Sequence, residues 1–175
     1  LSLISGVSQA DRGEVTLKGQ RYSDLTEIQL SDLRAQHIGI VFQNFHLVTY
    51  LTALENVLLP LRVNNESQNV NRAQELLEQV GLQERVDHLP SQLSGGEQQR
   101  VALARAVIHN PTLILADEPS GSLDEETGEQ IMRLLFDLAQ DNQSSLLLVT
   151  HNKSLANRCQ RQLHIQKGRI TDHEI

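Results

Sequence analysis

Polar side chains that follow three apolar segments are the residues of this chain best suited to chemistry. The segment "TLILADE" ends in Asp117 and Glu118, "SLLLVTH" ends in His151, and "HIGIVFQ" ends in Gln43. One carboxylate can hold the water shell of a metal while the other activates an attacking water, and neutral side chains can contact a phosphate. If these residues meet at one place, the pattern predicts hydrolysis of a magnesium-bound nucleotide.

A glycine-rich stretch, "SQLSGGEQQR" at residues 91 to 100, is the second candidate. Ser94, Gly95 and Gly96 stand directly before a predicted helix, and backbone N–H groups at a helix start bind phosphate. The sequence contains no Gly-Lys pair, so the usual phosphate loop GxxxxGK[ST] is missing from it. The residues therefore leave open whose phosphate this glycine loop holds.

Each of these residues also has an ordinary structural interpretation when it is considered alone. A carboxylate after a strand is usually a solvated turn residue, and a single histidine at a strand end is usually a surface residue. The glycine pair also fits a tight turn. Asp124 is followed by two glutamates and is predicted to cap a helix. The functional interpretation depends on all of them occurring together in this order.

The apolar segments predict the elements that bring these side chains together. "TLILAD" and "SLLLVT" are almost wholly apolar, as in strands that are covered on both faces. A helix over about residues 124 to 140 is long enough for a parallel crossover between them. Ligands bind beyond the carboxyl ends of parallel strands. We therefore expect an α/β fold whose sheet edge carries Gln43, Asp117, Glu118 and His151.

The remaining helices are predicted from helical spacing and from stop signals. Leu1, Ile4 and Val7 predict the end of a helix, and a short helix is expected over residues 24 to 35. "LTALENVLLPLRV" and "NRAQELLEQVGL" predict two helices, with "NNESQN" as a polar loop between them and Gly81 as a stop. Another helix is expected from about Gly96 to His109.

Two short hairpins are also expected. "GEVTLKG" alternates apolar and polar residues between glycines, and "RQLHIQKGRI" predicts a hairpin that turns at Lys167-Gly168. No internal repeat and no low-complexity tract is found in the sequence.

Composition limits the classes of protein to which the chain can belong. A length of 175 residues favours one domain, and 22 acidic against 15 basic residues argue against a surface that coats nucleic acid. Cys159 is the single cysteine, so no internal disulfide forms. No apolar run is long enough to cross a bilayer and no signal peptide opens the sequence. We therefore expect a soluble, cytoplasmic domain.

The order of these motifs resembles the nucleotide-binding domains of ATP-binding cassette (ABC) transporters over nearly the whole chain. "VFQ" resembles the Q-loop, "LSGGEQQRVALARA" the signature and its helix, and "LILADEP" the Walker B strand. "SGSLD" is similar to the D-loop and "VTH" to the H-loop. The resemblance implies a P-loop NTPase-like parallel sheet core at 1–43 and 93–175, with a helical subdomain inserted at 44–92.

The resemblance also implies a role for each residue at the sheet edge. Gln43 would sense Mg2+ and couple to a permease, and Asp117 would hold the waters of the metal. Glu118 would be the general base, and His151 would contact the γ-phosphate of ATP. Gln43 and Asp117 would thus form the metal site, and Glu118 and His151 the catalytic pair.

The same resemblance implies whose phosphate the glycine loop binds. Ser94, Gly95, Gly96 and Glu97 would bind the γ-phosphate of an ATP that is held by a second nucleotide-binding domain. Asp124 would reach across the same interface. The resemblance therefore implies a dimer, most simply a homodimer, that encloses its nucleotides between the two subunits.

The function implied is an ATP-hydrolysing subunit that powers a membrane exporter. It would work with a permease and without nucleic acid, peripherally on the cytoplasmic face of the cell membrane. "FQNFHLVTYLTALENVLLPL" is similar to cassettes of the lipoprotein-release and macrolide-export type. The substrate is not readable, because in this family the membrane partner selects it.

Two departures from the family pattern are found. Ser120 and Ser122 replace the more common threonine and asparagine or alanine of the D-loop. "LSLISGV" directly follows the phosphate loop in the family, so the Walker A lysine is expected upstream of Leu1. Residues 1 to 175 by themselves are accordingly expected neither to bind ATP well nor to hydrolyse it.

Two alternative functions remain open at the level of sequence. One is an ABC-type ATPase in DNA repair or on ribosomes; chromosome-type members carry a very long coiled coil between Q-loop and signature. Here Gln43 and Ser94 are 51 positions apart and the chain is acidic, which favours transport. The other alternative is an interaction module that binds no nucleotide and offers only its signature face.

Overall fold

A computed structural model describes residues 1–63 and 69–173 of the chain. The predicted polar loop "NNESQN" lies outside the described residues except for its last member, Asn69. Within the described ranges, no helix combines the length and the apolar character that crossing a membrane requires.

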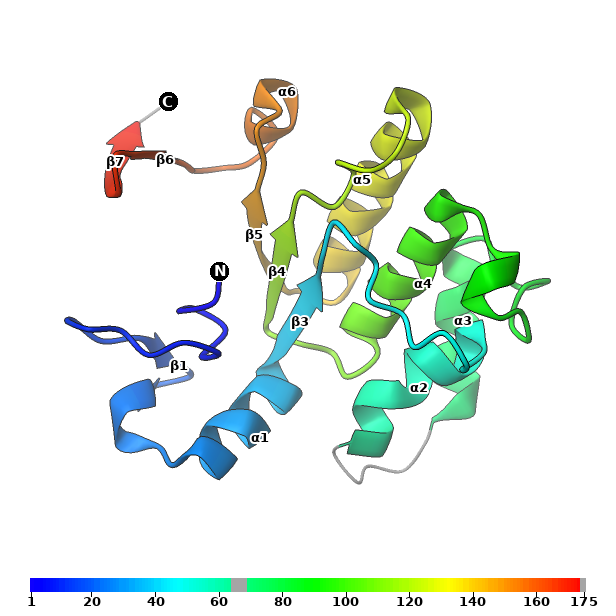
Figure 1. Cartoon of the computed structure of the whole chain (residues 1–175), viewed down its shortest axis with the longest axis horizontal. Helices are drawn as coiled ribbons and strands as arrows, with labels where there is room; N and C mark the ends of the chain where they lie inside the picture. Colours follow the sequence, from blue (N-terminus) through cyan, green and yellow to red (C-terminus); the bar gives the residue numbers. More distant parts are fainter. Residues whose placement is uncertain (64–68, 174–175) are drawn as a thin grey trace.

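A parallel sheet of three strands forms the centre of the molecule. Its order is β3 (Ile38–Val41), β4 (Leu113–Asp117) and β5 (Ser145–Val149), and α5 (Glu125–Asp141) is the crossover from β4 to β5. Figure 1 shows the three arrows side by side and pointing the same way. The predicted α/β fold with a parallel sheet is confirmed, and the strands end at one common edge.

The prediction that both apolar strands are covered on both faces is correct only for β4. The middle of β4 is buried, whereas the centre of β5 is only partly buried and Val149 is 40% exposed. The reason is the strand order, which puts β4 between two neighbours and β5 at the edge of this three-stranded sheet.

A layer of helices covers one side of the sheet. The helix α4 (Gly95–Val107) packs on β3 and α5, and α2 (Ala53–Val63) and α3 (Val70–Gln79) pack on α4 (Figure 1). Contact between β3 and α4 is close, because a Cβ atom at Gly39 would collide with the carbonyl oxygen of Ala106. The predicted helices are confirmed, and α3 ends two residues before the predicted stop at Gly81.

The core lies between the sheet and this helical layer and continues among the helices. Its largest fully buried side chains are Leu76, Leu77, Leu82, Leu103, Ile114, Leu115, Ile131, Met132, Leu135, Leu138, Gln99 and Val41. Gln99 is the one polar side chain in this set of described residues.

The N-terminal segment differs from its prediction. The Ser5 N–H bonds to the Leu1 carbonyl, but the N–H groups of Val7 and Ser8 both bond to the Ser2 carbonyl. Residues 2 to 6 therefore form turns, and the predicted helix at Leu1–Val7 is wrong. Gly6 has a φ of 69°, in the left-handed region, which ends the turn before a helical ladder can form.

The following elements agree better with the sequence. A hairpin of β1 (Thr16–Leu17) and β2 (Gln20–Arg21) leads through η1 (Tyr22–Asp24) to α1 (Glu27–His37). The cap of α1 is Thr26, whose side chain accepts the Gln29 N–H. The helix predicted at 24 to 35 is thus confirmed, with a later start.

The chain closes with small elements beyond β5. The short helix α6 (Lys153–Ala156) leads to an antiparallel hairpin of β6 (Gln162–Gln166) and β7 (Arg169–His173). Its turn lies at Lys167 and Gly168, both with positive φ, as the sequence predicts. A further short helix, η2 (Pro90–Gln92), precedes the glycine loop.

Candidate functional site

The ends of β4 and β5 bring Glu118 and His151 together. The Glu118 carboxylate accepts a hydrogen bond from the His151 backbone N–H at 2.6 Å and one from the Thr150 hydroxyl at 3.3 Å. The His151 Nε2 atom lies 3.9 Å from the same carboxylate, and the imidazole is otherwise exposed. A carboxylate held in this way is fixed by backbone and side chain while the histidine beside it faces outward.

The backbone at Glu118 has an unusual conformation. Its φ is 43°, in the left-handed region that non-glycine residues rarely adopt. The Glu118 N–H donates to the Val149 carbonyl at 3.0 Å, so the turn stays attached to β5 directly after Asp117 ends β4. Strain of this kind persists where the surrounding structure enforces it, and it gathers at functional sites.

Gln43 reaches the same region from β3 and lies against the turn formed by residues 120 to 124. A Cβ atom at Gly121 would lie 3.0 Å from the Gln43 Nε2 atom and 3.3 Å from the Glu118 carbonyl oxygen. The Ser122 hydroxyl donates to the Gln43 carbonyl at 3.1 Å. Gly121 thus lets the Gln43 amide approach the Glu118 turn, a role that inspection of the sequence missed.

Ser94 and Glu97 lock the start of α4 in a capping box. The Ser94 hydroxyl accepts the Glu97 N–H at 3.2 Å, and the Glu97 carboxylate accepts the Ser94 N–H at 2.8 Å. The hydrogen bond from the Ser94 backbone is the main cause that lowers the pKa of Glu97, and Arg85 at 3.3 Å adds to it. The predicted helix start is confirmed, and its glutamate is a structural cap.

The capping box leaves two donors free. In the described part of the chain, the N–H groups of Gly95 and Gly96 have no acceptor, because the first N–H groups of a helix lack intrahelical partners. Free donors at the positive end of a helix are groups that bind anions. Phosphate binding by the glycine loop stays a prediction.

The two glycines differ in what the fold requires of them. A Cβ atom at Gly96 would lie 2.6 Å from the Thr127 methyl group on α5, so Gly96 allows α4 and α5 to pack. A Cβ atom at Gly95 would make ordinary contacts, 3.4 Å from Leu123 and 3.7 Å from Phe45. A substitution at Gly95 therefore tests phosphate binding by the loop without disturbing the packing of α4 on α5, whereas a substitution at Gly96 disturbs that packing.

Asp124 caps α5, as the sequence predicts. Its side chain accepts the Thr127 N–H at 3.0 Å, and this backbone hydrogen bond is the main cause that lowers the pKa of Asp124. The carboxylate is exposed beside the glycine loop, since Thr127 also contacts Gly96.

The residues predicted to hold a metal ion are Asp117 and Gln43. Among the described residues, no group of three or more histidine, cysteine, aspartate or glutamate side chains could hold a metal ion. Magnesium commonly keeps several waters and takes one or two protein oxygens together with substrate phosphates. Asp117 is the last residue of β4 and Gln43 follows β3 at the same edge of the sheet, so both oxygen-bearing side chains start from the edge where such an ion is predicted.

The chain is similar to known ATP-binding proteins of transporters. The family model described as "ABC transporter" matches residues 1–121. The chain is 48% identical to the uncharacterized ABC transporter ATP-binding protein YbbA of Escherichia coli (strain K12) over 174 residues, covering 98% of this chain and 76% of that protein. It is 42% identical to the lipoprotein-releasing system ATP-binding protein LolD of Xanthomonas oryzae pv. oryzae (strain MAFF 311018), covering 98% of this chain and 71% of LolD.

Solved structures give the same result. The ATP-binding cassette MJ0796, described as a dimeric structure of a post-hydrolysis state bound to ADP and Pi, matches with a TM-score of 0.85 and 38% identity. The match covers 98% of this chain and 78% of that one. A second dimeric structure of MJ0796 matches with the same TM-score and 39% identity.

Proposed function

The chain belongs to the ABC transporter family of ATP-binding proteins, and we propose that the residues at its sheet edge hydrolyse ATP with Mg2+ to power a membrane exporter. Membership of this family shows that the protein is an ATPase that powers a transporter. The observation that carries the assignment of residues is the contact between Glu118 and His151 at the ends of β4 and β5.

In the proposed mechanism Glu118 is the general base. Its carboxylate takes the proton of the water that attacks the γ-phosphate, and His151 donates a hydrogen bond to that phosphate. Asp117 and Gln43 would hold the magnesium ion. The ion supplies positive charge to the phosphate oxygens when it is bound.

The glycine loop acts on a partner subunit in this proposal. MJ0796 is dimeric in its solved structures, and the N–H groups of Gly95 and Gly96 lack an acceptor among the described residues. We propose that they bind the γ-phosphate of ATP held by a second copy of the protein. Ser94 and Glu97 fix the loop for this purpose, and Asp124 lies beside it for contact across the interface.

Phosphate release from ATP by the native full-length protein, with Mg2+ and with a chelator, tests the proposed activity. Gly121→Ala sharpens the test, because the added methyl group would lie 3.0 Å from the Gln43 amide nitrogen and 3.3 Å from the Glu118 carbonyl oxygen. It therefore presses on both segments of the proposed site. We expect the Mg2+ concentration for half-maximal turnover to rise and turnover to fall about tenfold, since small misplacements are costly in catalysis.

A matched control is Gly19→Ala, since a Cβ atom at Gly19 meets no neighbouring atom within 4 Å. It is expected to keep wild-type turnover, with some loss of stability because its φ is positive. Metal-independent phosphate release by the wild type would contradict the proposed activity. Unchanged magnesium dependence in Gly121→Ala would remove Gln43 from the metal site.

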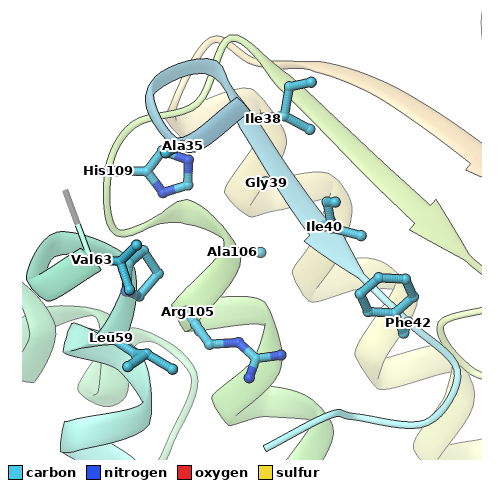
Figure 2. Close-up of a pocket in the computed structure, with 11 residues that line it drawn as sticks. Ala35, Ile38, Gly39, Ile40, Phe42, Leu59, Val63, Arg105, Ala106 and His109 are labelled. Atoms are coloured by element: carbon cyan, nitrogen blue, oxygen red, sulfur yellow. The ribbon is translucent and has the colours of Figure 1, made fainter. Parts of the chain in front are cut away.

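A groove next to Gln43 is suited to the permease. Figure 2 shows it between β3, α2 and α4. Its volume is about 330 Å³. Its lining is largely apolar and includes Ile40, Phe42, Leu59 and Val63, of which Phe42 is 38% and Val63 69% exposed. Exposed apolar side chains around a groove favour the apolar face of a partner helix.

One of the residues that line the groove is Phe42, which directly precedes Gln43. Arg105 also lines the groove and donates to the carbonyls of Phe45 and His46, just beyond Gln43. Burial lowers the pKa of Arg105. We propose that a helix of the permease on its cytoplasmic side occupies this groove, so that docking acts on the segment that carries Gln43.

Val63→Asp is expected to weaken association with the permease on the order of tenfold or more, because it puts an unpaired carboxylate into an apolar interface. Pull-down of the permease by the purified protein measures the effect. Val70→Asp is the control, since Val70 is an exposed valine at the start of α3 and outside the groove. Equal recovery with both variants would mean that the permease docks elsewhere.

This docking mode implies a peripheral position on the cytoplasmic face of the membrane. We also propose the division into a helical insert at 44–92 and a catalytic core at 1–43 and 93–175, because α2 and α3 lie within the insert and pack on α4 of the core. Because α4 packs both on β3 and on α2 and α3, it is the element that joins the two parts.

A further inference from the structure

Gln99 is a fully buried glutamine on α4, with 0% of its surface exposed. Its Nε2 atom donates to the carbonyl of Phe42 at 3.3 Å and to the carbonyl of Pro119 at 2.6 Å. These partners lie 57 and 20 residues away in the sequence. One amide nitrogen thus joins three distant segments of the chain.

Both acceptors adjoin residues of the proposed catalytic site. Phe42 directly precedes Gln43, and Pro119 directly follows Glu118. The helix that carries Gln99 begins at the glycine loop. Gln99 therefore connects the metal-binding segment, the turn of the general base and the helix that faces the partner's nucleotide.

The oxygen of the Gln99 amide indicates that this position is not occupied by glutamine for the stability of the fold. Its Oε1 atom is buried and has no hydrogen-bond partner among the described residues. An unpaired buried oxygen is unfavourable, and an apolar side chain of similar size would avoid it. We infer that the amide is used through its nitrogen, which donates to the carbonyls of Phe42 and Pro119.

Arg105, a second polar side chain of α4, has different hydrogen-bond partners from Gln99. Arg105 donates to the carbonyls of Phe45 and His46, so it also holds the segment after Gln43. Its hydrogen bonds do not extend to the Glu118 turn in the described chain. Gln99 is thus the side chain through which α4 holds both segments at once.

We propose that Gln99 is a positioning residue that sets the separation of Gln43 and Glu118 and couples it to the position of α4. The proposal rests on the proposed function, since it concerns the geometry of that site. Gln99 touches carbonyl oxygens of the chain and acts on the reaction only through its neighbours.

Gln99→Met removes the donors and keeps the approximate length and volume of the side chain. In the native full-length protein we expect kcat to fall about 10- to 100-fold with little change in KM for ATP, because ATP is still bound while the attacking geometry is lost. Gln98→Met is the control, since the Gln98 amide donates to the carbonyl of Leu93, just before α4, and makes no hydrogen bond to Phe42 or Pro119 among the described residues. It is expected to keep wild-type kcat.

Gln99→Glu separates positioning from folding when kcat is compared over the pH range in which the variant keeps its melting temperature. A carboxylate cannot donate to the two carbonyls, whereas its protonated form can donate to one, and burial favours protonation. The ratio of variant to wild-type kcat should therefore rise as the pH falls from about 8 to about 6. If Gln99→Met does not fold, this pH profile decides the question.

Several results would overturn the proposal. One such result is a wild-type kcat in Gln99→Met. Another is a fall in the activity of Gln99→Met that is matched by a lower melting temperature, together with no recovery of activity at low pH in Gln99→Glu. Absence of ATPase activity in the wild type would instead contradict the proposed function, so the two failures are distinguishable.

Discussion

Glu118→Gln is expected to lower the rate of ATP hydrolysis by ~10²–10⁴-fold, the usual contribution of a general base, while ATP binding persists. The substitution removes basicity and little else. A glutamine oxygen still accepts the His151 N–H, and its amide nitrogen can donate to the Thr150 hydroxyl, which donates to Glu118 in the wild type. The left-handed backbone at this position is kept, because the side chains have the same shape.

Dimers of Glu118→Gln should accumulate in the presence of ATP, since closure would no longer end in hydrolysis. Phosphate release gives the rate, and size-exclusion chromatography with and without ATP gives the oligomeric state. Glu84→Gln is the matched control, because Glu84 is an exposed glutamate outside the site. Near wild-type turnover in Glu118→Gln would assign the base to another residue.

Gly95→Asp is expected to abolish ATP-driven dimerisation and to lower turnover by at least about 10²-fold, as loss of a preorganised donor site does. The fold should tolerate the change, because a Cβ atom at Gly95 makes only ordinary contacts and an acidic residue suits the first turn of a helix. The same carboxylate repels a γ-phosphate that approaches the free N–H groups. We therefore expect Gly95→Asp to keep its stability while it loses ATP-driven dimerisation and turnover.

Nucleotide binding by the monomer distinguishes action on a partner from action within one chain. Gly95→Asp should leave the affinity of the monomer for ATP unchanged, as measured by calorimetry with a slowly hydrolysed analogue. Ser91→Asp is the control, since it adds the same charge at an exposed position of η2. An equal loss of monomer binding in Gly95→Asp would show that the loop contacts its own nucleotide.

The sequence alone determined the features that depend on local chemistry. The apolar runs before Asp117 and His151 form parallel strands because such segments need burial, and β4 and β5 end at the same edge. Asp124 and Ser94 cap helices because their side chains satisfy N–H groups three residues away. The same local rules misjudged Leu1–Val7, where Gly6 and the bonds to the Ser2 carbonyl end the helical pattern.

Only the tertiary structure decided how these parts are joined. Gly121 is needed because the Gln43 amide packs on it, and Gly96 because α5 passes beside α4. Gln99 bonds to carbonyls that are 57 and 20 residues away, and a glutamine on a helix carries no local sign of such partners. Side-chain spacing predicts which face of an element is buried, but the atoms that meet there depend on how distant segments pack.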